Sequence, residues 1–351
     1  MRYQPLGQSG LRVSELCLGA MTFGQQRGSW GADKADSRKV FDAFVEAGGN
    51  FFDTANTYQG GESETFLGEF VGAERDHYVI ATKFSAGLRA GDPNAWGNGR
   101  KNIRQSVEAS LRRLGTDYID LYWMHAWDQA TPQEEVLRAL DDLVTSGKVL
   151  HIGLSDTPAW VIARSQTIAE LRGWAPLAAV QLPYSLVERT PERELLPMAE
   201  RLGLGVTTWG GLGSGILSGK YTAAGNGSGR LHHAEFARPD RISEAKLAVA
   251  AQVSDIAEDL GVRPAQVALA WLRQRSSAIV PIIGARTVDQ LQENLACLNT
   301  TLDPATRQRL DNASAIDMGF PTDFLTGDMY ERVFRQSMST LISPPAAGPR
   351  V

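Results

Sequence analysis

Short apolar runs alternate with longer segments of helical periodicity along this sequence, and the pair recurs eight times in series. The predicted strands end, in chain order, at Gly19, Asp53, Lys83, His125, Leu154, Leu182, Thr208 and Ile283. Repeated strand-then-helix order predicts a parallel sheet, because parallel neighbours need a crossover connection, which is usually a helix. Eight such units favour a closed (β/α)8 TIM barrel with its helices outside.

An open, doubly wound sheet is the alternative arrangement for such a chain. It usually has fewer strands and carries a GxGxxG turn after its first strand. No such motif follows the first predicted strand, which ends at Gly19. We therefore predict a barrel that forms a single domain over residues 1–351, with a loose tail after about residue 340.

Two features lie outside the regular repeat. Residues 3–19 contain two short extended runs around a turn signal, Gln8-Ser9-Gly10, and predict an N-terminal β-hairpin. The segment 210–242 follows the seventh strand and has little periodicity, so it is expected as a long loop at the C-terminal face of the barrel.

Helical periodicity predicts helices over 37–47, 100–114, 243–260 and 264–275, among others. Three more helices are expected to begin at Thr-Pro pairs, whose threonines are residues 131, 157 and 190. In this interpretation the threonine hydroxyl caps the helix and the proline takes its first position.

The composition is that of an ordinary globular enzyme, with 43% hydrophobic residues and a net charge of -5. The sequence has no basic block, which argues against a nucleic-acid partner. It has neither an apolar signal core nor an apolar run long enough to span a membrane. Cys17 and Cys297 lie in apolar segments and are expected to be free thiols, so we predict a cytoplasmic protein.

Polar side chains stand at the ends of three successive predicted strands. Asp53 ends the second strand, Lys83 the third and His125 the fourth, and Tyr58 lies in the loop after Asp53. Active sites of parallel barrels lie at the C-terminal ends of the strands. We therefore expect these four side chains to gather on one rim.

The four side chains suit proton transfer to a carbonyl group. Tyrosine ionises at about pH 10, and a neighbouring ammonium lowers that pKa, so Lys83 would make Tyr58 a better acid. Asp53 would pair with Lys83 and fix its direction, and His125 would point at the carbonyl oxygen. No side chain can donate a hydride, so this chemistry implies a nicotinamide cofactor.

A metal site and a hydrolase are the competing interpretations of this rim. Barrels often hold metals with Asp, His and Lys side chains, but His232 and His233, two of only five histidines, lie in the long loop. A serine hydrolase would need a G-x-S-x-G turn after a strand, and Gly213-Ser214-Gly215 lacks that spacing. A metal-dependent barrel hydrolase is kept as the weaker alternative.

A series of motifs runs through most of the chain, to about Asn299. They are Phe52-Asp53-Thr54-Ala55-x-x-Tyr58 followed by Glu64 and Gly68, Ala81-Thr82-Lys83, Asp117-Tyr118-Ile119-Asp120-Leu121-Tyr122-x-x-His125, Ile152-Gly153-Leu154-Ser155, Val180-Gln181, Gly215-Ile216-Leu217-Ser218-Gly219-Lys220-Tyr221, and Ile282-Ile283-Gly284-Ala285 with Glu293-Asn294. Together they are highly specific, and the chain resembles the aldo-keto reductase superfamily, in its bacterial branch related to the potassium-channel beta subunits.

This resemblance implies a catalytic tetrad of Asp53, Tyr58, Lys83 and His125, with Tyr58 as the proton donor. It also implies reduction of aldehydes and ketones by NADPH, with NADH as a weaker alternative, and a small carbonyl compound as the substrate. A cofactor-binding regulatory subunit with slow or no turnover stays open, because the potassium-channel beta subunits belong to the same superfamily.

The resemblance also implies a cofactor site. The positions that match it are Ser155, Asp156, Gln181, Trp209, Gly210, Leu212, Gly215, Lys220, Gly284, Arg286, Gln290, Glu293 and Asn294. Ser155 and Gln181 would hold the nicotinamide carboxamide, and Trp209 would stack on the ring. Asp156 stands where many members have Asn, and an ionised Asp can accept a hydrogen bond but not donate one.

At the other end of the cofactor, Glu293 and Asn294 would hold the adenine, and Gly284 would let the pyrophosphate approach closely. Arg286 would face the 2′-phosphate, where a guanidinium favours NADPH over NADH. Gln290 stands where many members have an Arg on that phosphate, which leaves Arg286 more decisive.

Aromatic side chains on the loops after the strands are expected to form an apolar substrate pocket. Its candidates are Phe23, Trp30, Trp96 and Trp127. One exposed tryptophan on a loop carries little information, but several above one rim suggest a funnel for an apolar substrate.

Overall fold

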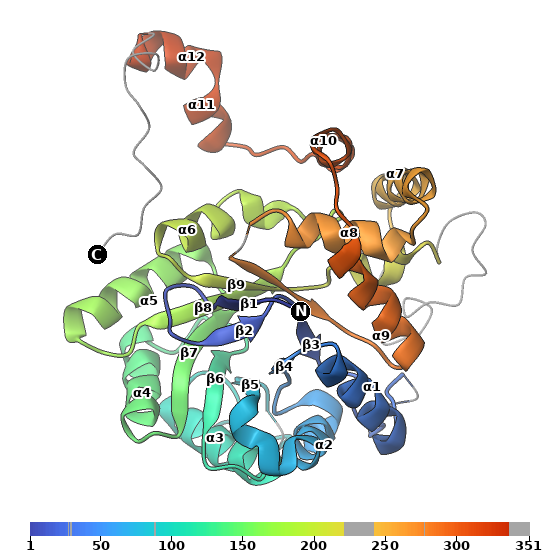
Figure 1. The fold of residues 1–351 in the computed structure, drawn as a ribbon. Helices are drawn as coiled ribbons and strands as arrows, with labels where there is room; N and C mark the ends of the chain where they lie inside the picture. Colours follow the sequence, from blue (N-terminus) through green and yellow to red (C-terminus); the bar gives the residue numbers. More distant parts are fainter. Residues whose placement is uncertain (27, 29, 88, 221–241, 277, 337–351) are drawn as a thin grey trace.

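The computed structural model describes residues 1–336 except 27, 29, 88, 221–241 and 277. Its centre is a closed barrel of parallel strands in the order β10-β3-β4-β5-β6-β7-β8-β9, surrounded by helices (Figure 1). The barrel strands are β3 (Cys17–Gly19), β4 (Phe51–Asp53), β5 (Val79–Phe84), β6 (Ile119–Met124), β7 (Val149–Ser155), β8 (Leu177–Pro183), β9 (Gly205–Trp209) and β10 (Ile279–Ile283). The predicted (β/α)8 barrel is confirmed.

The predicted N-terminal hairpin is also present and consists of β1 (Tyr3–Pro5) and β2 (Arg12–Ser14). It lies across the N-terminal end of the barrel (Figure 1), where the Gln8 amide donates to the Gly203 carbonyl and the Ser14 amide donates to Asn50 Oδ1. The hairpin therefore closes the end of the barrel opposite to the strand ends that carry the candidate site.

The helices follow the strands in the expected alternation. They are α1 (Lys34–Glu46), α2 (Glu62–Val71), α3 (Arg100–Leu114), α4 (Gln133–Thr145), α5 (Ala159–Arg172), α6 (Leu195–Arg201), α7 (Glu244–Leu260), α8 (Pro264–Arg273), α9 (Val288–Leu295), α10 (Pro304–Ala313), α11 (Thr322–Thr326) and α12 (Asp328–Tyr330). Shorter turns are η1 (Tyr58–Gly61), η2 (Gly72–His77), η3 (Thr190–Glu192), η4 (Gly213–Ser218), η7 (Ala296–Asn299) and the π-helical η8 (Glu331–Arg335).

The third Thr-Pro pair opens a short helical turn, η3, with Thr190 as its first residue and Pro191 as its second. The first two pairs are used differently from the prediction. Pro132 and Pro158 are the N-cap residues of α4 and α5, with extended backbones, and not the first helical residues. The Thr131 hydroxyl donates to Asp128 Oδ2 at 2.6 Å, and the Thr157 hydroxyl donates to the Ser155 carbonyl at 2.7 Å. These threonines therefore stabilise the preceding loops and do not cap the helices.

Alternate residues of each strand face the barrel interior. On β5, Val79 and Ala81 belong to the buried interior cluster, and Lys83 continues the same face at the open end. Gly153 on β7 makes room for this layer, since a Cβ there would lie 2.3 Å from the ring of Trp123. The interior is thus a packed hydrophobic layer beneath a polar layer.

A C-terminal arm, residues 316–336, follows α10 and contains α11, α12 and η8; in Figure 1 it projects away from the barrel. The loose tail predicted after about residue 340 lies outside the described residues. So does most of the predicted long loop, because only 210–220 and 242 of that segment are described.

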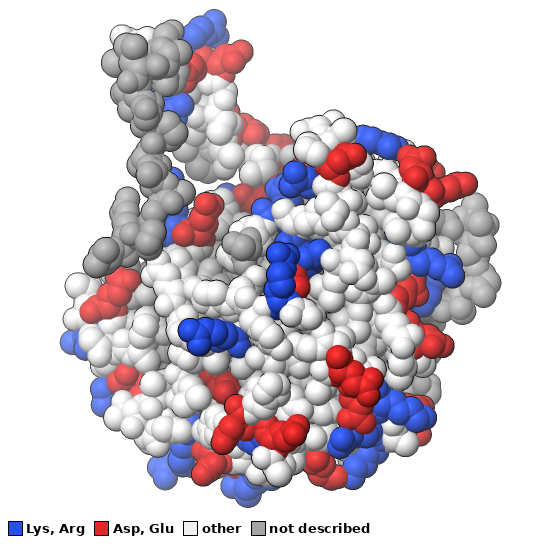
Figure 2. All heavy atoms as spheres, viewed as in Figure 1, with Lys and Arg blue, Asp and Glu red and all other residues white. Residues whose placement is uncertain are grey.

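On the face shown in Figure 2, acidic and basic side chains are interspersed among the described residues. No helix in the described part of the chain is both long and apolar enough to cross a membrane. The cytoplasmic location stays a prediction.

Candidate active site

Three of the four predicted tetrad side chains meet at the open end of the barrel. Lys83 is fully buried, and its Nζ forms an ion pair with Asp53 Oδ2. The same ammonium donates to the Thr54 carbonyl at 2.7 Å and to Tyr58 Oη at 3.3 Å. A continuous hydrogen-bonded chain therefore joins the carboxylate, the ammonium and the phenol.

Local backbone structure places the phenol above the ammonium. The Asn56 amide donates to the Lys83 carbonyl at 3.1 Å, which fastens the loop after β4 to β5. Tyr58 then opens η1, in which Gln59 is left-handed with φ 49°. A positive φ costs energy for a residue with a Cβ, so this sharp turn is held by its surroundings.

The remaining oxygen of Asp53 is also engaged. Asp53 Oδ1 accepts a hydrogen bond from Gln181 Nε2 at 2.9 Å, and both side chains are almost fully buried. The sequence predicted Gln181 only as a cofactor ligand. Alternate residues of a strand face the same side, and this alternation points both Gln181 on β8 and Asp53 on β4 into the barrel interior. That alternation is the signal that could have revealed the contact.

The electrostatics of the ammonium and the phenol differ. Burial alone would lower the pKa of Lys83, but the Asp53 carboxylate outweighs it and raises that pKa, so the lysine stays charged. Burial raises the pKa of Tyr58 and prevails over the opposing effect of Lys83. The predicted lowering of the Tyr58 pKa is therefore wrong, and the phenol is held in its protonated form.

His125 completes the tetrad beside the phenol. Its ring centroid lies 5.9 Å from that of Tyr58, at an interplanar angle of 83°. Burial, together with the positive charge of Lys83, lowers the pKa of His125 to about 3, so the imidazole is neutral at physiological pH. Its Nδ1 is buried and has no hydrogen-bond partner within the described structure.

A cavity of about 540 Å³ lies between the loop after β9 and the segment after β10. Its lining includes these predicted cofactor residues: Gly210, Leu212, Gly215, Lys220, Gly284, Arg286, Gln290, Glu293 and Asn294. A Cβ on Gly284 would meet nothing within 4 Å, so this glycine leaves open space. The Arg286 amide donates to Gln290 Oε1 at 3.0 Å, and Asn294 Nδ2 donates to the Gly284 carbonyl at 3.2 Å.

The predicted nicotinamide residues do not line this cavity but stand at the strand ends nearer the tetrad. Ser155 is buried, and its Oγ has no hydrogen-bond partner in the described part of the chain. Trp209 is 43% exposed, and its Nε1 donates to Asp156 Oδ1 at 3.2 Å. Desolvation raises the pKa of the Asp156 carboxyl against the opposing effects of Trp209 and Lys83.

The predicted substrate-pocket aromatics fall into different environments. Trp30 lines the cavity, whereas Trp96 is 56% exposed beside a separate surface hollow. Trp127 packs edge-to-face on Trp160, with centroids 5.6 Å apart. Phe23 is fully buried in the core, so its assignment to the pocket is corrected: an apolar ring on a loop packs inward when helices cover that loop.

The sequence patterns did not identify Trp160, which is 58% exposed on the first turn of α5. This turn directly follows the loop at the C-terminal end of β7. A helix N-terminus at that end of a parallel barrel faces the site, which is the signal that could have identified it.

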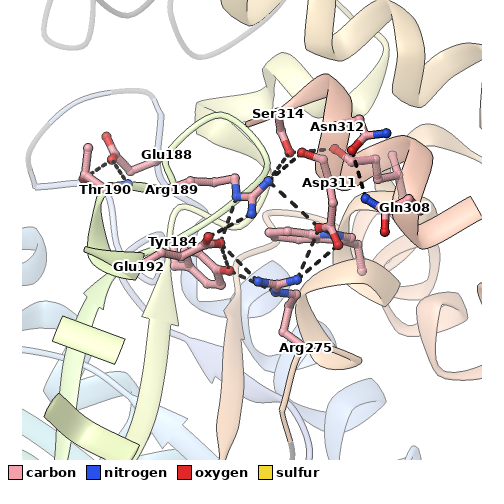
Figure 3. Close-up of polar contacts among 12 residues, drawn as sticks. Tyr184, Glu188, Arg189, Thr190, Glu192, Arg275, Gln308, Asp311, Asn312 and Ser314 are labelled. Carbon is pink, nitrogen blue, oxygen red and sulfur yellow. Dashed lines mark hydrogen bonds and ion pairs between the residues drawn. The ribbon is translucent and has the colours of Figure 1, made fainter. Parts of the chain in front are cut away.

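A polar network supports the strand end that carries Trp209 (Figure 3). The Trp209 carbonyl accepts a hydrogen bond from the Tyr184 amide at 3.2 Å. The Tyr184 hydroxyl contacts Glu192 and accepts from Arg275 Nε at 3.2 Å. Arg275 in turn pairs with Asp311 on α10, so the last helix of the barrel is connected to the candidate site.

Comparison with known proteins assigns the class. The aldo/keto reductase family model matches residues 15–315, and the chain therefore belongs to the aldo/keto reductase family. Among the described residues, no group of three or more His, Cys, Asp or Glu side chains could hold a metal ion.

Characterised and uncharacterised oxidoreductases are similar to this chain over most of its length. It is 40% identical to norsolorinic acid reductase stcV of Emericella nidulans, over 95% of this chain and 86% of that protein. It is 36% identical to an aryl-alcohol dehydrogenase [NADP(+)] of Phanerodontia chrysosporium, over 89% of this chain and 85% of that protein. It is 38% identical to the uncharacterized oxidoreductase YrpG of Bacillus subtilis, over 86% and 93% of the two chains. The protein is thus an oxidoreductase of this family, and the narrower bacterial, potassium-channel-related branch stays a prediction.

Proposed function

We propose that the protein reduces aldehydes and ketones to alcohols with NADPH and catalyses the reverse oxidation with NADP. The observation that carries this proposal is the contact of Lys83 Nζ with both Asp53 and Tyr58 Oη at the open end of the barrel. It supports a phenol that gives a proton to, and takes it back from, a substrate oxygen.

Each tetrad residue has a role in this proposal. Tyr58 donates the proton to the carbonyl oxygen, and Lys83 stabilises the phenolate that results. Asp53 keeps Lys83 charged and oriented. His125, neutral at physiological pH, orients the carbonyl oxygen toward the phenol by a hydrogen bond from its ring.

The residues of the open end fit a nicotinamide dinucleotide, which would supply the hydride. The buried Ser155 hydroxyl has no hydrogen-bond partner among the residues that the structure describes, which suits an interaction with the carboxamide. Lys220 and Arg286 bring positive charge to the cavity, and Gly284 leaves it open. We assign Arg286 to the 2′-phosphate, which favours NADPH over NADH.

We further propose aromatic aldehydes, and the corresponding aryl alcohols, as the substrate class. One similar protein is named an aryl-alcohol dehydrogenase that uses NADP. In this chain, Trp127 and the exposed Trp160 pack together beyond β6 and β7 and offer an apolar wall to a flat substrate.

The test is loss of NADPH absorbance with an aromatic aldehyde, with NADH assayed in parallel. Tyr58→Phe removes the proton donor, so kcat is expected to fall on the order of 10²- to 10⁴-fold while NADPH still binds. Tyr118→Phe changes a tyrosine whose hydroxyl bonds to Asp76 on the outer surface, and it should leave kcat unchanged. NADPH binding by the wild-type protein without turnover would support the regulatory alternative instead.

A further inference from the structure

Asp156 is an acidic residue at the open end that lies outside the tetrad. It follows Ser155, the last residue of β7, and its backbone is left-handed with φ 42°. Its amide donates to the Gln181 carbonyl at 3.3 Å, and its carbonyl accepts from the Trp127 amide at 3.5 Å. These contacts fix the residue between β8 and the loop after β6.

The side chain of Asp156 is oriented as well. Its Oδ1 accepts the indole N–H of Trp209 at 3.2 Å, and Trp209 is the last residue of β9. Gln181, whose carbonyl accepts from the Asp156 amide, donates its side-chain amide to Asp53 Oδ1 at 2.9 Å, so Asp156 lies beside a residue that contacts the tetrad. The Asp156 carboxylate also contributes to raising the pKa of Tyr58.

Asp156 contributes a negative charge beside the tetrad. The charges of Lys83 and Asp53 cancel in their buried ion pair. His125 and Tyr58 are neutral at physiological pH, because burial lowers the pKa of the first and raises that of the second. Asp156 is a further acidic group that acts on Tyr58, and its carboxylate brings a negative charge that lies outside the ion pair.

We infer that Asp156 is a specificity-determining residue that favours binding of the oxidised, positively charged nicotinamide over the neutral reduced form. The inference rests on the proposed function, since it requires a bound nicotinamide that exchanges hydride with the carbonyl carbon of the substrate while Tyr58 exchanges a proton with the carbonyl oxygen. Opposite charges attract only in the oxidised complex. At a solvent-accessible rim this attraction corresponds to about a threefold to tenfold change in relative affinity.

The experiment measures dissociation constants of NADP and NADPH by calorimetric titration of the full chain at neutral pH. The wild-type protein is compared with Asp156→Asn, which removes the charge but keeps an oxygen acceptor for Trp209. The ratio of the NADP constant to the NADPH constant should rise about threefold to tenfold in the variant. The difference should shrink in concentrated salt, which screens charges at exposed sites.

Two control variants separate the effect of the Asp156 charge from the effects of a distant charge and of the hydrogen bond to Trp209. Asp142→Asn removes one negative charge from the outer face of α4, where Asp142 pairs with Arg100 and Arg138, and should leave the ratio unchanged. Trp209→Phe keeps the Asp156 charge but removes its hydrogen bond, so both constants should change in parallel.

An unchanged ratio in Asp156→Asn would overturn the inference while leaving the proposed reaction intact. If the wild-type protein bound neither dinucleotide, the proposed function would fail, and the inference with it. Binding of both forms, with a ratio that shifts only when Asp156 loses its charge, is the supporting result.

Discussion

Lys83 is a fully buried cation whose charge is balanced by one nearly buried carboxylate, Asp53. Lys83→Met is expected to leave Asp53 buried without a cation, with only the Gln181 amide and no charged partner. Breaking a buried ion pair in this way costs about 3–5 kcal/mol in the free energy of unfolding. Denaturation by urea at neutral pH measures it.

The double variant Asp53→Asn with Lys83→Met removes both charges and should recover a large part of that loss, because an uncompensated charge no longer remains. The single variant Asp53→Asn completes the comparison. If the double variant lost as much free energy of unfolding as the two single variants together, the ion pair would not act as one unit.

His125 makes a second residue-scale prediction, for stability against pH. Its pKa is about 3 in the folded protein, below the ordinary value of 6.5, so the unfolded chain binds the proton first as pH falls. The contribution of His125 to stability is complete above about pH 6.5 and is lost progressively toward pH 3, by at most about 1.4 kcal/mol per pH unit.

His125→Asn cannot bind this proton. Its free energy of unfolding should therefore depend less steeply on pH than that of the wild-type protein between about pH 6.5 and pH 4. Urea titrations at several pH values give both slopes, and parallel slopes would show that His125 is accessible to protons in the folded state.

The gathering of Asp53, Tyr58, Lys83 and His125 could be predicted from sequence because the ends of parallel strands meet on one rim. The direction of the Tyr58 pKa could not, because it depends on how far the loop after β4 buries the phenol. Burial depends on segments that are distant in sequence. For the same reason the predicted place of Phe23 in the substrate pocket was wrong, because its ring packs on Phe70 of α2.

At the scale of elements, α10 is attached to the barrel by the polar network of Figure 3. Arg189 is nearly buried; it pairs with Glu192 and donates to the Asp311 carbonyl and to Ser314 Oγ. Arg189→Met is expected to lower the free energy of unfolding by about 3 kcal/mol, because it leaves these buried acceptors unpaired. Hydrogen exchange should increase over residues 304–313 before it increases in β5 and β6.

The matched control is Arg309→Met, on α10 itself. Arg309 forms an exposed pair with Asp259, and exposed pairs contribute about 0–1 kcal/mol. Equal effects of the two substitutions would show that the network does not fasten the helix.

Element order was predictable from periodicity, and so was the range of α3. The starts of the helices after Thr-Pro pairs were not. The two threonines before α4 and α5 bond to acceptors two or three residues earlier in the chain, Asp128 for Thr131 and the Ser155 carbonyl for Thr157. The Thr-Pro pattern alone does not show that such an acceptor competes with the helix N-terminus for the hydroxyl.

At the scale of the whole molecule, the barrel and the C-terminal arm differ in how they are stabilised. The match to the family model ends at residue 315, and the arm begins immediately after it. The apolar side chains of the arm include Phe320, Met329 and Phe334, which are 57% to 86% exposed. Phe324 packs against Phe334 with centroids 6.0 Å apart, so the arm packs largely on itself.

A chain that ends at Ala315 is therefore expected to keep the fold of the barrel. Among the described residues, the hydrogen bonds between arm and barrel join the exposed Arg193 guanidinium to the Asp317 carbonyl. Their loss should change the free energy of unfolding by less than about 1 kcal/mol in urea. Binding of an apolar dye should fall in the shortened chain, because the exposed aromatic side chains are removed. A large loss of stability would instead show that the arm packs on the barrel in solution, since only buried apolar area could supply that energy.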